Sequence, residues 1–279
     1  MAKHFSFEFF PPKTDAGVLK LREVYKTLAA LRPEYFSVTY GAGGSTRERS
    51  LGTVLEIQRD SGCGAAPHLS CIGDSKAELA ELLDIYKANG IRHIVALRGD
   101  LPSGSGPGSG ELAFAADLVG FIRERHGDQF HIEVAAYPEC HPQAADLGSD
   151  IRHFVHKVRQ GADSAITQYF FNADSYFYFV QAAHRQGIDI PIIPGIMPIT
   201  NFANLVRFSD ACGAEIPRWI RRQVSSYGDD TASIQKFGED VVTDLCSQLL
   251  TGGAPGLHFY TMNQAEPTLA LWKNLGLPG

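Results

Sequence analysis

The chain has 279 residues, of which 44% are hydrophobic and 20% charged, an ordinary globular composition that can supply a large apolar core. Its formal net charge of -6 argues against a nucleic-acid partner, because binding phosphates requires an excess of Lys and Arg. No stretch approaches the roughly 18 consecutive apolar residues of a membrane-spanning helix, and the N-terminus lacks a signal-peptide pattern. We therefore expect a cytoplasmic protein without a membrane partner that acts on a small molecule.

Short β-rich runs alternate with longer amphipathic segments along the whole chain, as in repeated βα units around a parallel sheet. Eight runs are predicted as strands: residues 4–10, 35–40, 65–71, 92–98, 130–137, 163–170, 190–196 and 256–261. Glycines 62, 90, 161 and 187 each follow a helical run, where a left-handed C-cap favours glycine. The pattern predicts an α/β fold, a single-domain (β/α)8 TIM barrel over residues 1–279.

The connection between the seventh and eighth predicted strands is long. It holds a predicted helix over 201–211, an IPRW segment at 216–219 and a second predicted helix over 230–250, and we expect it to form part of a lid. Residues 102–110, PSGSGPGSG, are low in complexity and are predicted to form a flexible loop.

Several chemistries find no matching motif. The five cysteines are odd in number and widely spaced, without a CxxC pair, so we expect reduced thiols and neither a disulfide framework nor a zinc site. There is no GxSxG elbow, no HExxH, no metal-spaced acidic cluster, no GxGxxG and no GxxxxGK. No metal is expected, and redox or acid/base chemistry on an organic cofactor held by the barrel loops remains.

Polar residues collect at the C-terminal ends of the predicted strands, where barrels of this kind carry their chemistry. In chain order the candidates are Glu8, Thr39, His68, the turn Arg98-Gly99-Asp100, Tyr137 with Glu139 and His141, Gln168, Asn201 and Tyr260.

Glu8 is the sharpest of these candidates. Strand alternation places Ser6, Glu8 and Phe10 on one face and directs the intervening phenylalanines to the other, so the carboxylate points inward. Surrounded by aromatic rings, it should be desolvated, which raises a carboxyl pKa and suits a general acid near neutral pH. The alternative is a buried glutamate paired with an arginine.

The other candidates allow structural interpretations as well. Arg98 and Asp100 could present opposite charges at the barrel mouth, or could form an internal ion pair within a turn. His68 lies in an apolar strand, where a lone histidine is more often a hydrogen-bonded core residue. His141, beyond the fifth strand, is better placed to contact a ligand.

The chain resembles the methylenetetrahydrofolate reductase family in its successive motifs FEFFPP, SVTYGAGG, APHLSC, HIVALRGDLP, AAYPECHP, GADSAITQYFF, PGIMP and HFYTMNQAE. The match spans nearly the whole chain, and this order and spacing are highly specific. The similarity is to the compact bacterial form, which has the catalytic barrel only.

This resemblance implies FAD at the barrel mouth and reduction of 5,10-methylenetetrahydrofolate to 5-methyltetrahydrofolate, in one-carbon metabolism and methionine biosynthesis, with NADH or NADPH as hydride donor. Glu8 would be the general acid that protonates the folate nitrogen released as the five-membered ring opens. Asp100 would hydrogen-bond the pterin and tune the flavin potential electrostatically. Thr39, Gln168 and Gln264 would complete the folate contacts. A homo-oligomer is implied in the same way.

The resemblance also implies the residues that would hold FAD. They are Thr39, His68, Leu97, Arg98, Gly99, Asp100, Tyr137, His141, Asp150 and Lys157. Asp146 competes with Asp150 for its role, because the segment before the helix varies in length among such proteins.

Two positions depart from the family pattern. Val224 stands where bacterial members carry an aromatic residue, in the loop after IPxW, that can stack on nicotinamide or pterin; Tyr227 could substitute. Gln264 stands where an arginine would meet the carboxylates of the folate tail, and glutamine carries no charge. Two alternatives therefore stay open: another barrel flavin oxidoreductase, for example one that oxidises an amine such as proline, and a folate- or flavin-binding protein without turnover.

Overall fold

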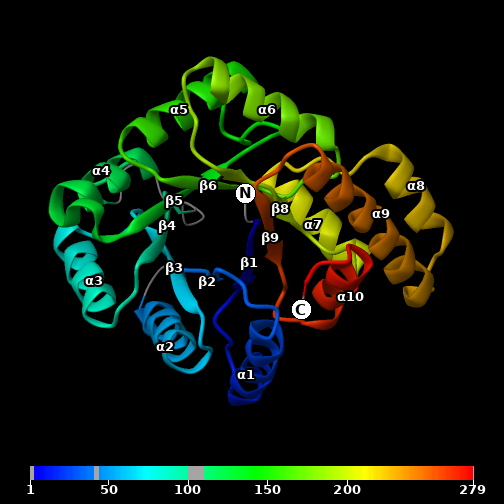
Figure 1. Cartoon of the computed structure of the whole chain (residues 1–279), viewed down its shortest axis with the longest axis horizontal. Coiled ribbons are helices and arrows are strands. Elements are labelled where there is room, and N and C mark those ends of the chain that lie inside the picture. The colour runs from blue at the N-terminus through cyan, green and yellow to red at the C-terminus, as the bar shows by residue number, and fades with distance from the viewer. Residues whose placement is uncertain (1–2, 41–43, 100–109, 279) are drawn as a thin grey trace.

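The computed structural model of the chain describes residues 3–40, 44–99 and 110–278. Asp100 and most of the predicted loop 102–110 lie outside these residues. Within them, parallel strands surround a central axis and helices pack outside the strands (Figure 1). The strands are β1 (His4–Phe9), β2 (Tyr35–Val38), β3 (Gly64–Ser70), β4 (His93–Leu97), β5 (His131–Ala136), β6 (Ser164–Thr167), β7 (Ile192–Ile193), β8 (Gly195–Ile196) and β9 (Gly256–Tyr260).

The eight predicted strands are confirmed, and the seventh is divided in two. The order around the barrel is β7-β6-β5-β4-β3-β2-β1-β9-β8, with β7 paired to β6 and β8 paired to β9. Pro194 separates the two pieces and has no N–H for a ladder. Its carbonyl still accepts the His258 N–H at 3.0 Å. Residues 192–196 therefore bring the two ends of the sheet together into a nearly closed (β/α)8 barrel.

The helices follow the strands in the expected alternation. They are α1 (Asp15–Ala29), α2 (Gly44–Asp60), α3 (Lys76–Ala88), α4 (Ala115–His126), η1 (Gly127–Gln129, 3-10), α5 (Leu147–Arg159), α6 (Ala173–Arg185), α7 (Phe202–Cys212), α8 (Arg218–Ser226), α9 (Thr231–Thr251) and α10 (Glu266–Asn274). Gly62, Gly90, Gly161 and Gly187 all have positive φ, which confirms their predicted place after helices.

The long connection between β8 and β9 contains three helices, one more than predicted. The predicted helices over 201–211 and 230–250 are confirmed as α7 and α9, whereas α8, which begins at Arg218 inside the IPRW segment, was not predicted. Its sequence, RWIRRQVSS, is mostly polar, but Ile220 and Val224 are four residues apart and both are buried. Packing against the barrel therefore stabilises a helix that the composition of the segment does not favour.

The buried apolar side chains form two separate clusters. The large one lies between strands and helices and contains Phe7, whose ring centre is 5.9 Å from that of Trp272 on α10. The small one consists of Tyr35, Ala66, Val95 and Ile166, with Leu97 and Tyr260 packed against it. Bulky branched residues usually fill the interior of such barrels. Here the interior face of β1 carries Ser6 and Glu8 instead, as the alternation predicts.

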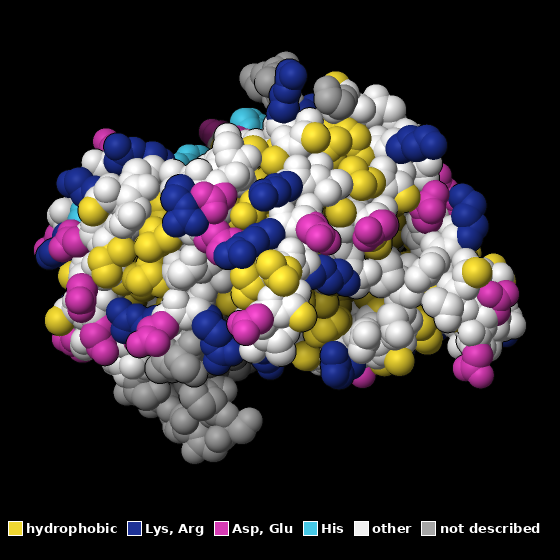
Figure 2. Space-filling view, turned by 90° about the horizontal axis from the view of Figure 1, so that it is seen from below, with side chains coloured by type: hydrophobic (Ala, Val, Ile, Leu, Met, Phe, Trp, Pro, Cys, Tyr) yellow, Lys and Arg dark blue, Asp and Glu magenta, His cyan; other side chains and the backbone are white. Residues whose placement is uncertain are grey.

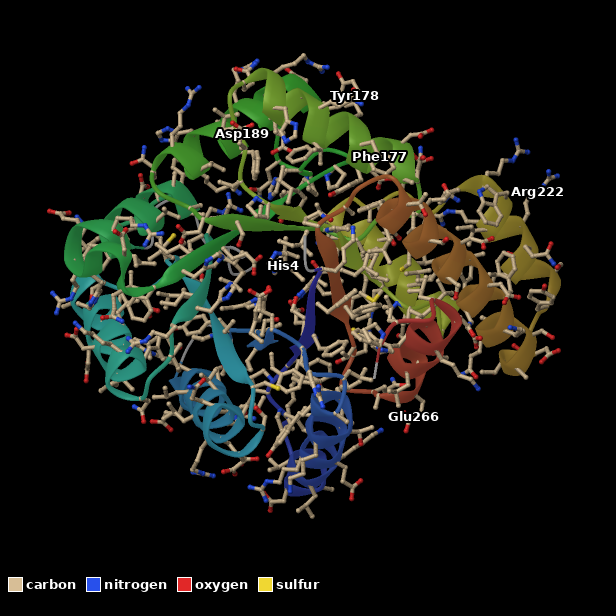
Figure 3. The ribbon with its side chains drawn as sticks, in the orientation of Figure 1. His4, Phe177, Tyr178, Asp189, Arg222 and Glu266 are labelled. Carbon is tan, nitrogen blue, oxygen red and sulfur yellow. The ribbon has the colours of Figure 1, made fainter. Side chains whose placement is uncertain are left out.

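The outer surface shows no segregation by charge on the face seen in Figure 2, where Lys and Arg are interspersed with Asp and Glu. All five cysteines lie in the described ranges and are free thiols. In the same ranges, no helix is long and apolar enough to span a membrane. Figure 3 shows His4 near the barrel axis, whereas Arg222 lies at the periphery on α8.

Candidate active site

The C-terminal ends of parallel strands meet at one end of a barrel, and Glu8 lies at this end of β1. Its Oε2 atom is 3.2 Å from Nε2 of His68 on β3 and 3.5 Å from Nε2 of His258 on β9. The glutamate side chain is 17% exposed, whereas the histidine side chains are 10% and 0% exposed. The three groups form a cluster in which a carboxylate and two imidazoles share one small, mostly buried volume.

The expectation that the Glu8 pKa is raised is wrong. Burial does raise it, but the charges and hydrogen bonds of His68 and His258 outweigh burial and lower the pKa from 4.5 to about 2. The alternative of a buried glutamate paired with an arginine is also wrong, because the partners are imidazoles. At neutral pH the carboxylate of the free protein is therefore ionised.

Ser6 and His258 complete the cluster and were not singled out from the sequence. Nδ1 of His258 is 2.7 Å from the Ser6 hydroxyl, and the two residues are direct partners in the β1–β9 register. The Nε2 atoms of His68 and His258 are buried without a hydrogen bond of good geometry. Strand alternation could have indicated His258, because it faces the same side of its strand as the candidate Tyr260.

The loop after β9 fixes the end of β1. The Thr261 hydroxyl donates to the Glu8 carbonyl at 2.6 Å, and the Asn263 side chain both donates to and accepts from the Phe10 backbone. Gln264, a predicted folate contact, follows directly and donates its N–H to the Thr261 carbonyl at 3.0 Å. These bonds place the Gln264 backbone beside the strand end that carries Glu8.

The ends of β3 and β4 approach each other very closely. The Ser70 hydroxyl donates to the Arg98 carbonyl at 2.8 Å, and a Cβ placed on Gly99 would lie 2.0 Å from the Ser70 Oγ. Gly99 also has a φ of +90°, a conformation that side chains disfavour. Arg98 donates from Nε to the Gly99 carbonyl at 3.3 Å. The proposed partner of Arg98, Asp100, lies outside the described residues.

Beyond β5, Asp150 is a buried residue of α5 that joins two of the predicted cofactor ligands. Its Oδ2 accepts the His141 N–H at 2.8 Å, and the His141 ring meets the Tyr137 ring edge to face at a centre distance of 4.5 Å. The Lys157 ammonium donates to the Ala135 carbonyl. Burial lowers the Lys157 pKa to about 8, and the charge of Asp150 opposes this effect.

Asp146 and Asp150, the two candidates for one cofactor contact, lie in different environments. Asp146 is exposed and caps α5, accepting the Ser149 N–H at 2.7 Å. Asp150 instead faces His141 and acts electrostatically on Lys157. The geometry therefore groups Asp150, and not Asp146, with the predicted cofactor residues.

Three further candidates lie at strand ends. Thr39 donates its N–H to the Phe9 carbonyl at 2.9 Å, which ties the end of β2 to that of β1. Gln168 is half-buried after β6 and accepts the Tyr169 N–H at 3.0 Å. Tyr260 donates its hydroxyl to the Thr167 carbonyl at 2.8 Å, which spans the mouth between β9 and β6.

Two candidates have evident structural roles. Asn201 caps α7 by accepting the Asn204 N–H at 2.9 Å, and Glu139 accepts the Glu215 N–H at 2.7 Å. Among the described residues, no group of three or more His, Cys, Asp or Glu is arranged to hold a metal ion.

The expected position of Val224 is wrong in one respect. It does not lie in a loop but in the last turns of α8, where it is 2% exposed and belongs to the large apolar cluster. Tyr227 follows the helix and packs its ring against Phe237, at a centre distance of 6.0 Å. Neither residue is an exposed stacking surface in this arrangement.

Comparison with known proteins is consistent over the whole chain. The family model described as methylenetetrahydrofolate reductase matches residues 1–276. Proteins named 5,10-methylenetetrahydrofolate reductase from Salmonella typhimurium and Escherichia coli are 42% and 41% identical over 275 residues, which cover 98% of this chain and 91% of each relative. An Arabidopsis thaliana protein named methylenetetrahydrofolate reductase (NADH) 1 is 35% identical over 98% of this chain and 48% of its own length.

Solved structures agree on the fold. An uncharacterized protein from Clostridium thermocellum, described as binding two copies of 5-methyl-5,6,7,8-tetrahydrofolic acid, has a TM-score of 0.67 at 14% identity and covers 98% of this chain and 96% of that one. A 2,3-dimethylmalate lyase has a TM-score of 0.54 at 8% identity, covering 100% and 83%. At these identities the likeness concerns the barrel alone. The family match and the bacterial relatives carry the assignment: this chain belongs to the methylenetetrahydrofolate reductase family.

Proposed function

We propose that this chain reduces 5,10-methylenetetrahydrofolate to 5-methyltetrahydrofolate with FAD as cofactor and a reduced nicotinamide as hydride donor. The observation that carries the proposal is the cluster of Glu8 with His68 and His258 at the C-terminal end of the barrel. A carboxylate held among imidazoles at the mouth suits a reaction that consumes a proton. Family membership supplies the reaction class.

The residues at the mouth fit FAD in their chemistry. Arg98 and Lys157 are cations, and Thr39, Tyr137 and the two histidines His68 and His141 can donate hydrogen bonds, as a diphosphate and a flavin ring require. Gly99 lets the β4 turn lie against Ser70, where any side chain would collide. When bound, FAD supplies hydride transfer between the nicotinamide and the folate carbon.

Glu8 delivers the proton in this scheme. The bond between the bridging methylene and the leaving folate nitrogen breaks, the nitrogen takes the proton, and the methylene carbon takes the hydride. In the free protein the Glu8 pKa of about 2 is unsuited to an acid. A ring system over the mouth would remove the remaining 17% exposure of the side chain and move the pKa upward. With its pKa raised in this way, Glu8 takes up a proton and transfers it to the leaving nitrogen.

The remaining polar residues orient the substrate. Gln168 and Gln264, together with Asp100 and Thr39, are assigned to the folate. Because Gln264 is uncharged, we expect it to bind the tail carboxylates less tightly than an arginine, which forms bidentate charged hydrogen bonds. The buried position of Val224 means that the nicotinamide must find its contacts elsewhere at the mouth.

An anaerobic titration tests the proposal. The flavin spectrum of the purified protein is recorded on adding NADH or NADPH and then methylenetetrahydrofolate, for wild type, Glu8→Gln and Glu124→Gln. Glu124 is exposed on α4 and serves as the control. We expect bleaching by a nicotinamide in all three. Reoxidation by folate should be slower in Glu8→Gln alone, by about 10²–10⁴-fold, the usual contribution of a general acid.

Other outcomes assign other functions. Bleaching by proline but by neither nicotinamide would indicate an amine-oxidising flavoenzyme. Tight flavin or folate binding without any bleaching would indicate a binding protein. Normal reoxidation by folate in Glu8→Gln would remove Glu8 as the acid.

A further inference from the structure

A chain of polar side chains runs through the barrel interior away from the mouth and begins at Glu8. Its first step is the pair Glu8 Oε2 and His258 Nε2, 3.5 Å apart, and its second is the 2.7 Å contact from His258 Nδ1 to the Ser6 hydroxyl. His258 and Ser6 are 0% and 3% exposed. The imidazole thus joins Glu8 to a hydroxyl that is one layer deeper in the barrel.

The middle of the chain crosses from β1 to β5. Ser6 and Tyr35 are direct partners in the β1–β2 register, which places their side chains next to each other in the barrel interior. The phenol donates to Glu133 Oε2, and Glu133 is 0% exposed. The phenol therefore hydrogen-bonds a fully buried carboxylate on one side and lies beside the serine on the other.

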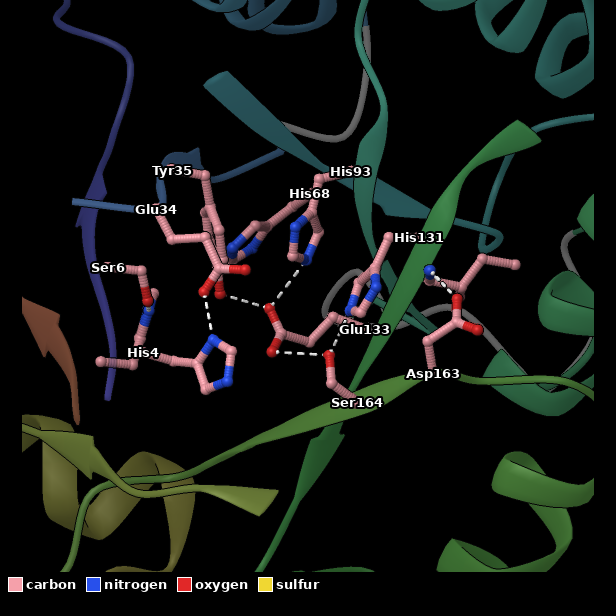
Figure 4. Close-up of polar contacts among 12 residues, drawn as sticks. His4, Ser6, Glu34, Tyr35, His68, His93, His131, Glu133, Asp163 and Ser164 are labelled. Carbon is pink, nitrogen blue, oxygen red and sulfur yellow. Dashed lines mark hydrogen bonds and ion pairs between the residues drawn. The ribbon is translucent and has the colours of Figure 1, made fainter. Parts of the chain in front are cut away.

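At the far end the chain divides between two histidines (Figure 4). Glu133 Oε2 is 3.1 Å from Nε2 of His93, and its Oε1 accepts the Ser164 hydroxyl at 3.0 Å. That hydroxyl is 2.7 Å from Nε2 of His131. The two imidazole rings are 4.4 Å apart between centres.

Both histidines line a cavity of about 260 Å³ at the N-terminal end of the strands. Its walls come from the starts of β2 to β5 and from helical turns between them, and include Glu34 and Arg92. His131 is an exposed residue, and Glu34 at the rim accepts from His4 at 2.6 Å. The chain therefore leads from Glu8 to a place where water has access from the face opposite the mouth.

This composition is difficult to explain by stability alone. Burying an ionised carboxylate costs several kcal/mol, and well-packed apolar residues of similar volume are often equal or better. Barrel interiors usually contain Val, Ile and Leu in layers. Here each polar side chain named along the route can both accept and release a proton, as hydroxyls, carboxyls and imidazoles do.

We propose that Glu8 is recharged with protons from the N-terminal end of the barrel, through His93 or His131, Glu133, Tyr35, Ser6 and His258. This rests on the proposed function, since each folate reduction takes one proton from Glu8. At each step one O–H or N–H bond breaks and another forms. One proton leaves water at the cavity, one arrives at Glu8, and the intervening groups return to their starting state by reorienting.

The direction of supply follows from the position of the substrate. Folate bound at the mouth would cover the exposed side of Glu8, while the cavity at the opposite end stays open to water. The groups that face the entry histidines are Glu34 and Tyr35 from β2 and the segment before it, Arg92 beside β4, and Glu133, Asp163 and Ser164 from β5, β6 and the turn between them. Partial burial of the imidazole, followed by the charge of His93, lowers the pKa of His131.

Tyr35→Phe tests the route at its narrowest point, because it removes the hydroxyl between Ser6 and Glu133 and keeps the ring. Tyr176→Phe is the matched control: Tyr176 is also buried, and its hydroxyl donates a single hydrogen bond, to the Ile192 carbonyl at 2.8 Å, outside the barrel interior. In a single turnover of pre-reduced protein with folate, Tyr176→Phe should match wild type and Tyr35→Phe should be slower, because Glu8 is ionised before folate binds. In steady state Tyr35→Phe alone should slow at least tenfold.

A second measurement needs neither cofactor nor substrate. Exchange of the His258 ring N–H with water is followed by NMR on protein labelled with ¹⁵N-histidine, and Tyr35→Phe should slow it about tenfold relative to Tyr176→Phe. In a third, the double variant His93→Ala with His131→Ala should lose steady-state turnover and regain it with added imidazoles, in proportion to the basicity of the imidazole.

The outcomes separate the two proposals. If wild type is not reoxidised by folate, the proposed function fails, and the exchange measurement still decides whether the route conducts protons. If wild type turns over and Tyr35→Phe equals Tyr176→Phe in both steady-state rate and exchange, the route is overturned and the proposed function stands.

Discussion

The buried carboxylate of Glu133 should make the free energy of unfolding fall in acid, and the substitution Glu133→Gln should remove this loss. Its burial raises the carboxyl pKa, but the hydrogen bond and charge of His93 and the hydrogen bond from Tyr35 lower it from 4.5 to about 2. A pKa lowered by folding contributes stability above the unfolded value that is lost as the pH falls toward the folded value. At about 1.36 kcal/mol per pKa unit, the difference amounts to about 3 kcal/mol, of which about 2 kcal/mol is lost by pH 3.

The assay is urea unfolding of wild type and Glu133→Gln at a series of pH values from 6 to 3. The wild type should lose about 2 kcal/mol more than the variant over this range. Glu8, whose pKa is also lowered, is present in both proteins and cancels in the difference. The exposed residue Glu81 on α3 provides the control variant, Glu81→Gln, which should follow wild type. Parallel pH profiles for wild type and Glu133→Gln would refute the reasoning.

Three further predictions concern single sites. Gly99→Ala places a Cβ 2.0 Å from the Ser70 Oγ, so the purified variant should retain less FAD than wild type by absorbance; equal flavin content would contradict this. Val224→Phe overpacks the buried face of α8 and should cost about 1–3 kcal/mol in urea unfolding, and no loss would mean that α8 can shift outward. The free energy of unfolding of the flavin-free protein should rise by about 3 kcal/mol between pH 8 and 10.5, because the folded Lys157 pKa of about 8 lies below its ordinary 10.5. Lys157→Met should lack this rise, and an unchanged rise in the variant would exclude Lys157 as its source.

Local sequence patterns were sufficient for the strands and most helices because these depend on neighbouring residues. Alternation along β1 placed Glu8 inside the barrel and the phenylalanines outside, and glycines marked the helix ends. The same reasoning failed for α8, whose helical state depends on Ile220 and Val224 finding a buried surface. A short polar segment carries no local sign that such a surface exists.

The electrostatics of Glu8 could not be read from its neighbours in the chain. The surrounding phenylalanines predicted desolvation correctly, since burial is the largest single effect on its pKa. The histidines that reverse the outcome come from β3 and β9, and only the strand order places both beside β1 or near it. A pKa depends on charges within a few ångströms in space, whatever their separation in sequence.

The sequence by itself determined the class of fold, the order of its elements and the family, because periodicity and motifs are properties of the linear chain. Only the tertiary structure decided which polar groups meet. The pairing register of the barrel strands brings Ser6 beside His258, Tyr35 against Glu133, and His93 next to His131. His93 and His131 are register partners on the neighbouring strands β4 and β5, whereas the other two contacts join residues 252 and 98 positions apart that only the barrel arrangement brings together. Proton chemistry depends on such distances in space.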